Sequence, residues 1–316
     1  MKRIISIGET LIDMISMDKE SSLDNVSGFI PKVGGAPLNV CGAISKLGGN
    51  SSIITMLGND PFGDKIINYA KEFNIDTSFI KRTNKANTSL AFVSRKANGE
   101  RDFSFYRKIG ADMLLDEDDV KEEWFKDAYA LHFCSVDLGD FPMRRAHKMA
   151  INYARKNNLI ISFDPNLRFQ LWDNLDNLKE TVNEFINYAD IIKISDEELS
   201  FITGYSNIEE AVNVLFRGNV KLIIYTCGKN GAYAITKNAL AYNKGYCIEN
   251  AVDTTGAGDG FIGSFLYQLE SNNIINLEDL TKEKLEDMLK FSNKFSAYSV
   301  LKEGSIASYP IKEDLK

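Results

Sequence analysis

Residues Asp253-Thr-Thr-Gly-Ala-Gly-Asp259-Gly-Phe-Ile-Gly-Ser-Phe265 predict a glycine-rich turn that opens a helix. After the turn, apolar residues recur at the spacing that keeps one helical face dry, at Phe261, Ile262, Phe265, Leu266 and Leu269. The first N–H groups of a helix have no partner inside it and lie at the positive end of its dipole. Bare amides at Gly256, Ala257 and Gly258 would therefore bind an anion.

Asp259 stands in the first turn of this predicted helix. Its location favours the carboxylate over the acid, and an ionised carboxylate beside an anion-binding turn can take a proton from a hydroxyl that attacks a phosphoryl group. The alternative is that Asp259 only caps the helix and that the glycines only allow tight packing, since such motifs also occur by chance. The rest of the chain has to decide between these two interpretations.

The composition predicts one large α/β domain or two smaller ones, because 316 residues can bury a substantial core either way. A net charge of −7 disfavours non-specific binding to nucleic acid or to an anionic membrane. Glu9 and Asp13 interrupt the apolar run at the amino terminus before a signal peptide is complete, and no later stretch approaches the length of a membrane span. The sequence therefore predicts a cytoplasmic protein.

Cysteine and histidine offer no catalytic set. The four cysteines are far apart: Cys41, Cys134, Cys227 and Cys247. They have no metal-ligand or redox spacing, and we expect each in an apolar setting as a reduced structural thiol. His132 lies in a predicted buried strand and His147 on a predicted helix, which leaves no evident Ser–His or Cys–His pair.

The segment Val33-Gly34-Gly35-Ala36-Pro37-Leu38-Asn39 predicts the start of a second helix, because proline suits the first helical position. Gly34 and Gly35 allow a ligand to approach the backbone closely. Asn39 can donate to a sugar hydroxyl or merely cap the helix. Asp13 follows the first predicted strand, where it can be a ligand contact or a solvated surface residue.

Residues 88–95 and 101–107 alternate in polarity and flank Asn98-Gly99, which is a strong hairpin signal. A two-stranded ribbon alone is only marginally stable, so this hairpin is expected to belong to a small separate sheet that covers a pocket. Arg107 ends the ribbon beside Tyr106. It is either a substrate contact or an exposed edge-strand charge that discourages aggregation.

From about residue 127 onward, strands and helices alternate. Strands are predicted at 129–135, 159–163, 190–194 and 220–226, and helices at 142–157, 174–188, 196–203 and 207–216. Such alternation favours a mainly parallel sheet covered on both faces, with function at the carboxyl ends of the strands. A second hairpin is expected within 231–248 and a closing helix at about 282–301.

Three of these strand ends carry polar clusters, at 164–168, 193–198 and 226–231. Arg168 can neutralise phosphate charge, and Glu198 can hold the water network of a Mg²⁺ ion. Each is alternatively a turn or helix-cap residue. The chain has no internal repeat, low-complexity tract or proline-rich linker, so we expect one fold with an inserted small sheet.

Two motifs together resemble the signatures of the ribokinase-like (PfkB) family of carbohydrate kinases: Gly34-Gly-Ala-Pro-Leu-Asn39 and Asp253-Thr-Thr-Gly-Ala-Gly-Asp259. The intervening motifs fall in the family's order, so the resemblance spans nearly the whole chain. Within the family, residues 99–107, 110–115 and 164–172 are most similar to the versions found in bacterial and plant fructokinases.

The resemblance implies a three-layer α/β/α domain over residues 1–316, with a mainly parallel sheet and a small β-sheet lid formed by about 10–33 and 88–110. It also implies ATP as the phosphoryl donor, Mg²⁺ and often a stimulating monovalent cation such as K⁺. The implied reaction is phosphorylation of D-fructose at its 6-hydroxyl, with sugar and ATP as the small-molecule partners. An exposed lid sheet would suit pairing with a second copy of the chain.

The resemblance also implies a role for individual residues. Asp259 matches the catalytic base, Gly256, Ala257 and Gly258 match the anion hole, and Arg168 resembles a residue near the transferred phosphate. The sugar contacts are Asp13, Gly34, Gly35, Asn39, Arg107 and Asp259. The nucleotide side comprises Lys193, Glu198, Thr226, Gly228, Gly231, Gly256 and Gly258. The monovalent cation region comprises Asp253, Thr255, Gly304 and Ser308.

One departure concerns the Asn-x-x-Glu motif of many relatives, which appears here as Ser195-Asp-Glu-Glu198 and leaves the organisation of Mg²⁺ open. The nearest alternative reaction is the same chemistry on 2-keto-3-deoxygluconate or another sugar. The former carries a carboxylate, so a second cation beside Arg107 would favour it. A sugar-binding sensor without catalysis is a further alternative, and the presence of Asp259 with its glycines weighs against it.

Overall fold

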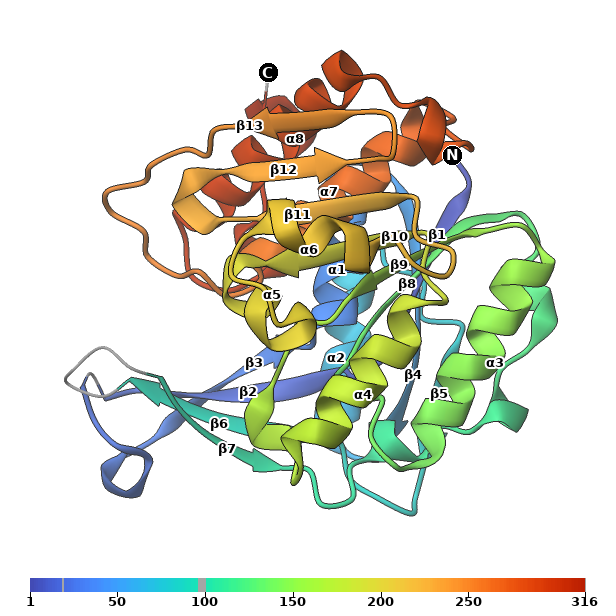
Figure 1. Ribbon diagram of the computed structural model, residues 1–316. Helices are drawn as coiled ribbons and strands as arrows, with labels where there is room; N and C mark the ends of the chain where they lie inside the picture. The colour runs from blue at the N-terminus through green and yellow to red at the C-terminus, as the bar shows by residue number, and fades with distance from the viewer. Residues whose placement is uncertain (19, 96–100, 316) are drawn as a thin grey trace.

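The computed structural model of the chain describes residues 1–18, 20–95 and 101–315 (Figure 1). Over these residues, nine strands form a large sheet in the order β13-β12-β11-β10-β9-β8-β1-β4-β5, and four form a small sheet in the order β3-β2-β6-β7. The predicted architecture, a mainly parallel sheet between helices with a small sheet beside it, is confirmed.

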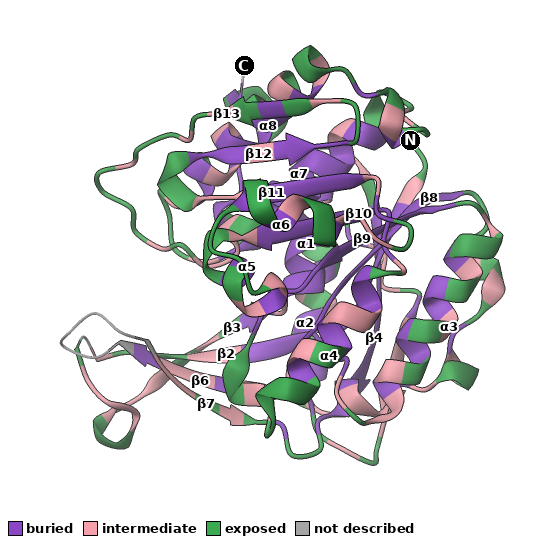
Figure 2. Ribbon diagram, in the orientation of Figure 1, coloured by how far each residue is buried: buried purple, intermediate pink, exposed green. Residues whose placement is uncertain are grey.

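The seven strands β11, β10, β9, β8, β1, β4 and β5 run parallel to one another. Strand β12 pairs antiparallel with β11, and β13 pairs antiparallel with β12. Their bounds are β1 (Arg3–Ile7), β4 (Asn50–Gly58), β5 (Ile80–Thr83), β8 (Ala128–Cys134), β9 (Ile160–Asp164), β10 (Ile191–Ser195), β11 (Leu222–Thr226), β12 (Ala232–Ile235) and β13 (Leu240–Asn243). The central strands are buried along nearly their whole length (Figure 2), as expected for a parallel sheet with helices on both faces.

Helices cover both faces of the large sheet. On one face lie α3 (Pro142–Lys156), α4 (Leu175–Ile186), α5 (Asp196–Thr203) and α6 (Ile208–Leu215). On the other face lie α1 (Ala36–Lys46), α2 (Pro61–Glu72), α7 (Ala257–Ser271) and α8 (Lys282–Ser299). The predicted helices are confirmed, with ends that differ from the sequence-based bounds by about two residues or fewer, as is usual where helices fray.

Helices α1 and α7 approach each other closely because a glycine lies between them. A Cβ on Gly263 would lie 2.7 Å from Ala43 Cβ and 2.9 Å from Val40 O. The absence of that carbon lets the two backbones pack together. Both helices therefore begin at the same edge of the large sheet, beyond the carboxyl ends of its parallel strands.

The small sheet comprises β2 (Leu11–Ser16), β3 (Phe29–Gly34), β6 (Leu90–Arg95) and β7 (Arg101–Tyr106). The predicted ribbon of β6 and β7 is confirmed, and β2 pairs parallel with β6. The predicted Asn98-Gly99 turn lies outside the described residues. The sheet projects from the edge where α1 begins (Figure 1).

The thiols and imidazoles differ in part from expectation. All four cysteines are free, and Cys41 and Cys134 are buried, but Cys247 is exposed, so the prediction of an apolar setting was wrong there. His132 lies 3.0 Å from Ser162 Oγ, a contact that the sequence did not suggest, yet both side chains are fully buried. Burial lowers the pKa of His132 to about 3 and that of His147 to about 4, so both rings are neutral.

Among the helices of the described residues, none combines the length and the apolar character that crossing a bilayer would demand.

Candidate active site

Side chains from three distant segments meet at the N-terminus of α7. Asp259 lies in the first turn of α7, Asn39 in the first turn of α1, and Asn166 just after β9. Asn39 Nδ2 donates to Asp259 Oδ2 at 2.9 Å, and Asn166 Nδ2 donates to Asp259 Oδ1 at 3.3 Å. Two amides therefore orient one carboxylate that keeps 8% of its surface exposed. Asn39 was predicted to bind sugar or cap its helix, and this bond to Asp259 was not foreseen.

The turn before Asp259 requires glycine at position 256. Gly256 has φ +76°, and a Cβ there would lie 2.7 Å from both Ser305 Cβ and Tyr309 Oη. Tyr309 Oη donates to Gly256 O at 2.6 Å, which fixes the turn from the C-terminal segment. Gly258 is exposed, but Ala257 N donates to Thr254 O at 3.2 Å. The prediction of three bare amides is therefore wrong for Ala257.

A buried ammonium group lies beside this turn. Lys193, in β10, donates from Nζ to Asp164 Oδ2 at 2.7 Å, and its Nζ would be 3.5 Å from a Cβ on Gly258. Burial lowers the pKa of Lys193, but the Asp164 and Glu198 carboxylates outweigh burial and hold the pKa above its usual range. The open side of the turn thus has a permanent positive charge next to it.

Burial raises the pKa of Asp259 from 3.8 to about 6. The hydrogen bond from Asn39 and the positive charges of Lys193 and Arg168 lower the pKa, while the negative charge of Asp164 raises it. The prediction that the location favours the carboxylate was wrong in direction, because desolvation outweighs the helix terminus. A carboxyl group with a pKa near 6 is still mostly ionised at pH 7, and it accepts a proton more readily than an ordinary aspartate.

The predicted sugar contacts lie on the small-sheet side of Asp259. Asp13, in β2, pairs in register with Lys32 of β3 and is half-buried. A Cβ on Gly34 would lie 3.0 Å from Asp13 Cγ, so glycine makes room for that carboxylate. Gly35 has φ +115°, and a Cβ there would lie 2.5 Å from Glu9 O. These positions require glycine for packing whether or not a ligand binds.

The predicted nucleotide and phosphate residues lie on the other side of Asp259. Arg168 is exposed, and its Nη1 donates to Leu167 O at 3.0 Å. Glu198 Oε1 accepts from Leu167 N at 2.7 Å, while Oε2 accepts from Ser195 N at 3.0 Å and from Ser195 Oγ at 2.9 Å. The helix-cap alternative for Glu198 is therefore present in the structure, and a role toward Mg²⁺ stays a prediction.

Thr226 to Gly231 form a tight turn after β11, in which Cys227 N donates to Gly231 O at 2.8 Å. Gly228 has φ +51° and Gly231 has φ +96°, conformations that favour glycine. A Cβ on Gly231 would lie 2.5 Å from Gly245 N. The turn is therefore packed against the loop that follows β13.

Two loops meet where the cation region was predicted. Asp253 Oδ1 accepts from Thr255 N at 2.9 Å and from Thr255 Oγ1 at 2.6 Å, while Asp253 Oδ2 accepts from Gly304 N at 3.0 Å. Ser308 is buried on a neighbouring turn and donates to Ser305 O at 2.8 Å. The structure thus links Asp253, Thr255 and Gly304 directly, whereas Ser308 bonds within its own turn.

Arg107 is not the exposed edge charge that the sequence allowed as an alternative, because it is buried and paired. Its Nε donates to Asp112 Oδ2 at 2.7 Å, and its Nη2 contacts Asp137. Its predicted contact with substrate stays a prediction.

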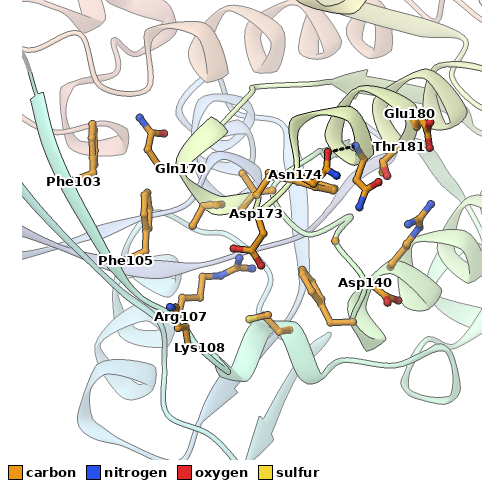
Figure 3. A pocket seen from close by; sticks show the side chains of 18 of the residues that line it. Phe103, Phe105, Arg107, Lys108, Asp140, Gln170, Asp173, Asn174, Glu180 and Thr181 are labelled. Atoms are coloured by element: carbon orange, nitrogen blue, oxygen red, sulfur yellow. Dashed lines mark hydrogen bonds between the residues drawn. The ribbon is translucent and has the colours of Figure 1, made fainter.

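A cavity of about 830 Å³ opens beside Arg107 (Figure 3). Its walls come from β7, from the loop after β8, from residues 170–174 and from α4. Phe103, Phe105 and Gln170 lie on its left side in the view, Asp140 and Thr181 lie on its right side, and Arg107 and Lys108 lie below. Asp259 is not among its lining residues, so this cavity does not include the Asp259 carboxylate.

Sequence reasoning missed Asn166, Asp164 and Tyr309 as parts of the site. Asn166 has φ +46° and stands two residues after the end of β9. A polar cluster directly after a parallel strand was the available signal for Asp164 and Asn166. Tyr309 had none, because its contact with Gly256 joins residues 53 apart.

The profile of pfkB family carbohydrate kinases matches residues 1–312. The chain belongs to the pfkB family of carbohydrate kinases. It is 39% identical over 312 residues to a protein named probable fructokinase-5 from Arabidopsis thaliana, a match that covers 98% of this chain and 95% of the relative. The predicted family is confirmed.

Two solved structures are similar to the whole chain. Fructokinase from Xylella fastidiosa with bound ATP has a TM-score of 0.89 and 30% identity, covering 99% of this chain and 96% of that one. A double mutant of fructokinase from Vibrio cholerae with fructose, ADP and potassium ion bound has a TM-score of 0.88 and 31% identity, covering 100% of this chain and 97% of that one. These neighbours confirm the predicted ribokinase-like fold.

Asp259→Asn is expected to raise the free energy of unfolding at pH 8 by about 2 to 3 kcal/mol, at 1.36 kcal/mol per pKa unit. The amide removes a buried charge whose folded pKa is about 6 rather than 3.8. When the pKa of a carboxyl group is higher in the folded protein than in the unfolded chain, its contribution to stability is fully present below the unfolded-chain pKa. That contribution is lost as the pH rises through the folded-state pKa. The gain should therefore vanish toward pH 3, which urea unfolding at pH 3 and pH 8 measures.

Asp164→Asn is the matched control. It removes the partner of the buried Lys193 ammonium, so it should lower stability at pH 8. An Asp259→Asn variant that is no more stable than the wild type at pH 8 would show that burial does not dominate the pKa of Asp259.

Proposed function

We propose that this protein is a fructokinase, which transfers the γ-phosphoryl group of ATP to the 6-hydroxyl of D-fructose. The observation that carries the proposal is the Asp259 carboxyl group, oriented by two amides at a helix N-terminus beside a buried ammonium. These groups supply a base and a positively charged site for an anion within one helical turn. The full-length similarity to fructokinases with ATP, or with fructose and ADP, supports the choice of substrates.

Asp259 acts as the general base. Its pKa of about 6 keeps it ionised at neutral pH, and its oxygens are fixed by Asn39 and Asn166. The sugar hydroxyl loses its proton to this carboxylate late in the transfer, as its oxygen bonds to phosphorus and the bond to the ADP oxygen breaks. Asp13, Gly34, Gly35 and Arg107 hold the sugar.

The phosphate side of the reaction is electrostatic. The amides of the turn at Gly256 and Gly258 and the charges of Lys193 and Arg168 offset the negative charge on the transferred group. Lys193 cannot readily lose its proton, because two carboxylates raise its pKa. Thr226, Gly228 and Gly231 form the nucleotide side with Glu198.

A divalent ion, which we take to be Mg²⁺, would neutralise charge on the phosphate oxygens when bound. Such ions are held by one or two carboxylates together with substrate phosphates rather than by a protein cage. Within residues 1–18, 20–95 and 101–315 there is no group of three or more His, Cys, Asp or Glu side chains that could hold a metal, which fits this mode. Glu198 would orient the water of the ion.

Neutral fructose is favoured over 2-keto-3-deoxygluconate by the charge around Arg107. Lys108 and Arg144 line the adjoining cavity and could supply the second cation that a sugar acid would use, although Arg144 is paired with Glu184. However, Asp140 and Asp173 line the same cavity, and Arg107 is already paired with two buried carboxylates. A substrate carboxylate would therefore meet little net positive charge.

A cytoplasmic location stays a prediction from the sequence.

An ATP-consumption assay with ketohexoses, aldohexoses and 2-keto-3-deoxygluconate tests the proposal. Fructose should give the highest kcat/KM, and Asp259→Asn should lower kcat by about 10² or more, the usual contribution of a general base. The wild-type kcat/KM should fall as the pH drops below about 6, because protonation of Asp259 removes the base.

Asp18→Asn serves as the control, since Asp18 lies half-buried after β2 and its carboxylate accepts hydrogen bonds from the N–H and the hydroxyl of Ser27. Near-normal turnover by Asp259→Asn would remove Asp259 from the base role. A preference for the sugar acid would select the alternative reaction, and binding of fructose without any ATP consumption would indicate the sensor.

We propose that the loops of Asp253, Thr255, Gly304 and Ser308 bind a monovalent cation, K⁺ being the candidate, which stabilises the glycine turn from behind. Asp253→Asn should abolish the stimulation of activity by K⁺ relative to a tetramethylammonium salt, because the carboxylate charge is lost. Thr255→Ser keeps the hydroxyl that donates to Asp253 and should therefore retain the stimulation by K⁺. Equal K⁺ stimulation in wild type and Asp253→Asn would exclude a cation there.

We propose that two copies of the chain pair through the small sheet. Ile15 and Ile30 lie opposite each other on β2 and β3 and are 37% and 45% exposed, an apolar pair that a second copy would cover. Ile30→Glu should shift the mass measured by light scattering from dimer to monomer. Ile275→Glu, at an exposed residue far along the chain, should not. A wild-type monomer at all concentrations would refute the pairing.

A further inference from the structure

Four charged side chains form a buried cluster at the base of the small sheet: Glu9, Arg107, Asp112 and Asp137. Each is less than a tenth exposed. They come from four places in the fold, namely the ends of β1, β7 and β8 and the short 3₁₀ turn Ala111–Leu114. We call these four residues the root cluster.

Asp112 links the two chain segments that flank the β6–β7 hairpin. Its Oδ2 accepts from Arg107 Nε at 2.7 Å and from Arg107 Nη2 at 2.5 Å, and Arg107 directly follows β7. Its Oδ1 accepts from Ser89 Oγ, and Ser89 directly precedes β6. One carboxylate therefore holds the entrance and the exit of the hairpin together.

Asp137 and Glu9 connect this joint to the large sheet. Asp137 lies three residues beyond the end of β8, and its Oδ1 accepts a hydrogen bond from Arg107 Nη2. Glu9 follows β1, and its Oε1 accepts from the N–H of Ala36, the first residue of α1, at 3.1 Å. Burial raises the pKa of Glu9 to about 7, and the positive charge of Arg107 opposes this rise. The root cluster thus reaches the Gly34–Gly35 turn.

The root cluster is an inefficient source of stability. The cluster holds three acidic side chains and one guanidinium, which pairs with two of them, Asp112 and Asp137. In the described structure, Glu9 Oε2 and Asp137 Oδ2 are buried without a hydrogen-bond partner. An unpartnered buried polar atom costs about 1–3 kcal/mol, and apolar side chains often replace buried ion pairs without loss. Its geometry, in contrast, is specific, since a planar guanidinium bridging two carboxylates allows one orientation.

We propose that Asp112 and Asp137 are positioning residues for the sugar acceptor: they fix the Arg107 guanidinium and, through it, the angle at which the small sheet stands over the Gly34–Gly35 turn. This inference rests on the proposed function, because it concerns the acceptor half of the same site. Arg107 touches the sugar, and the two carboxylates act through it. Within residues 1–18, 20–95 and 101–315, no hydrogen bond or ion pair joins the nucleotide half, at Thr226 to Gly231, to the root cluster.

The test uses Asp112→Asn and Asp137→Asn in the full chain. Each variant leaves Arg107 one buried carboxylate, so the guanidinium keeps a partner and we expect the fold to be retained. The KM for fructose should rise about ten-fold or more, as expected when a hydrogen bond from a charged group to the bound sugar is weakened equally in the ground state and the transition state. The KM for ATP and the kcat at saturating fructose should stay within about three-fold.

Arg107→Lys should show the same rise in the KM for fructose, because an ammonium cannot bridge two carboxylates in one plane. Ser89→Ala removes only the hydroxyl that donates to Asp112, and it should give a smaller rise of about three-fold. Asp116→Asn is the matched control. It breaks an exposed aspartate–arginine pair with Arg145 and should leave both KM values unchanged.

Fructose KM values within two-fold of wild type in both aspartate variants overturn the proposal. Parallel rises in the KM values for fructose and ATP, or unfolding of both variants together with an unchanged Ser89→Ala, also overturn it, since these outcomes mean a purely structural joint. If the wild type phosphorylates no sugar, the proposed function fails, and fructose titration calorimetry on the same variants still decides the inference through the fructose Kd.

Discussion

The structure depends on the close approach of α1 to α7. Gly263 lets the two helix backbones meet, and as a result Asn39 reaches across to the Asp259 carboxylate. The two helices begin at the same edge of the sheet, so their N-terminal turns lie side by side. The acceptor turn at Gly34–Gly35 and the anion turn at Gly256–Gly258 are thereby held as neighbours by helix packing, with no flexible linker between them.

Charge burial gives this site its chemistry at a cost in stability. Desolvation brings the pKa of Asp259 up to about 6, which makes it a better proton acceptor at neutral pH, while Asp164 keeps the buried Lys193 charged. A site with only exposed groups would be more stable but weaker in both roles, because water would screen the ammonium and solvate the carboxylate. The polar residues of the site therefore oppose folding where they favour phosphoryl transfer.

The sequence predicted the fold and the glycine turn that opens α7, because both follow from local patterns. Alternating strands and helices indicated the parallel sheet, and the Asp-Thr-Thr-Gly-Ala-Gly-Asp stretch indicated the turn before α7. What could not be predicted depends on residues distant in the chain. The Tyr309–Gly256 bond, the pairing of Arg107 with Asp137 and the raised pKa of Asp259 each arise from tertiary packing, which no spacing of residues encodes.

The small sheet is attached at one end, and this has a mechanical consequence. Its strands run outward from the root cluster and from the Gly34–Gly35 turn, with the edge near Ser16 and Phe29 farthest from these attachments. A six-residue strand spans about 20 Å, so a turn of about 5° at the attachment displaces the far edge by nearly 2 Å. The small sheet therefore acts as a lever arm that amplifies any rotation at the root cluster. The rigidity of these buried ion pairs limits how far the outer edge of the sheet can move.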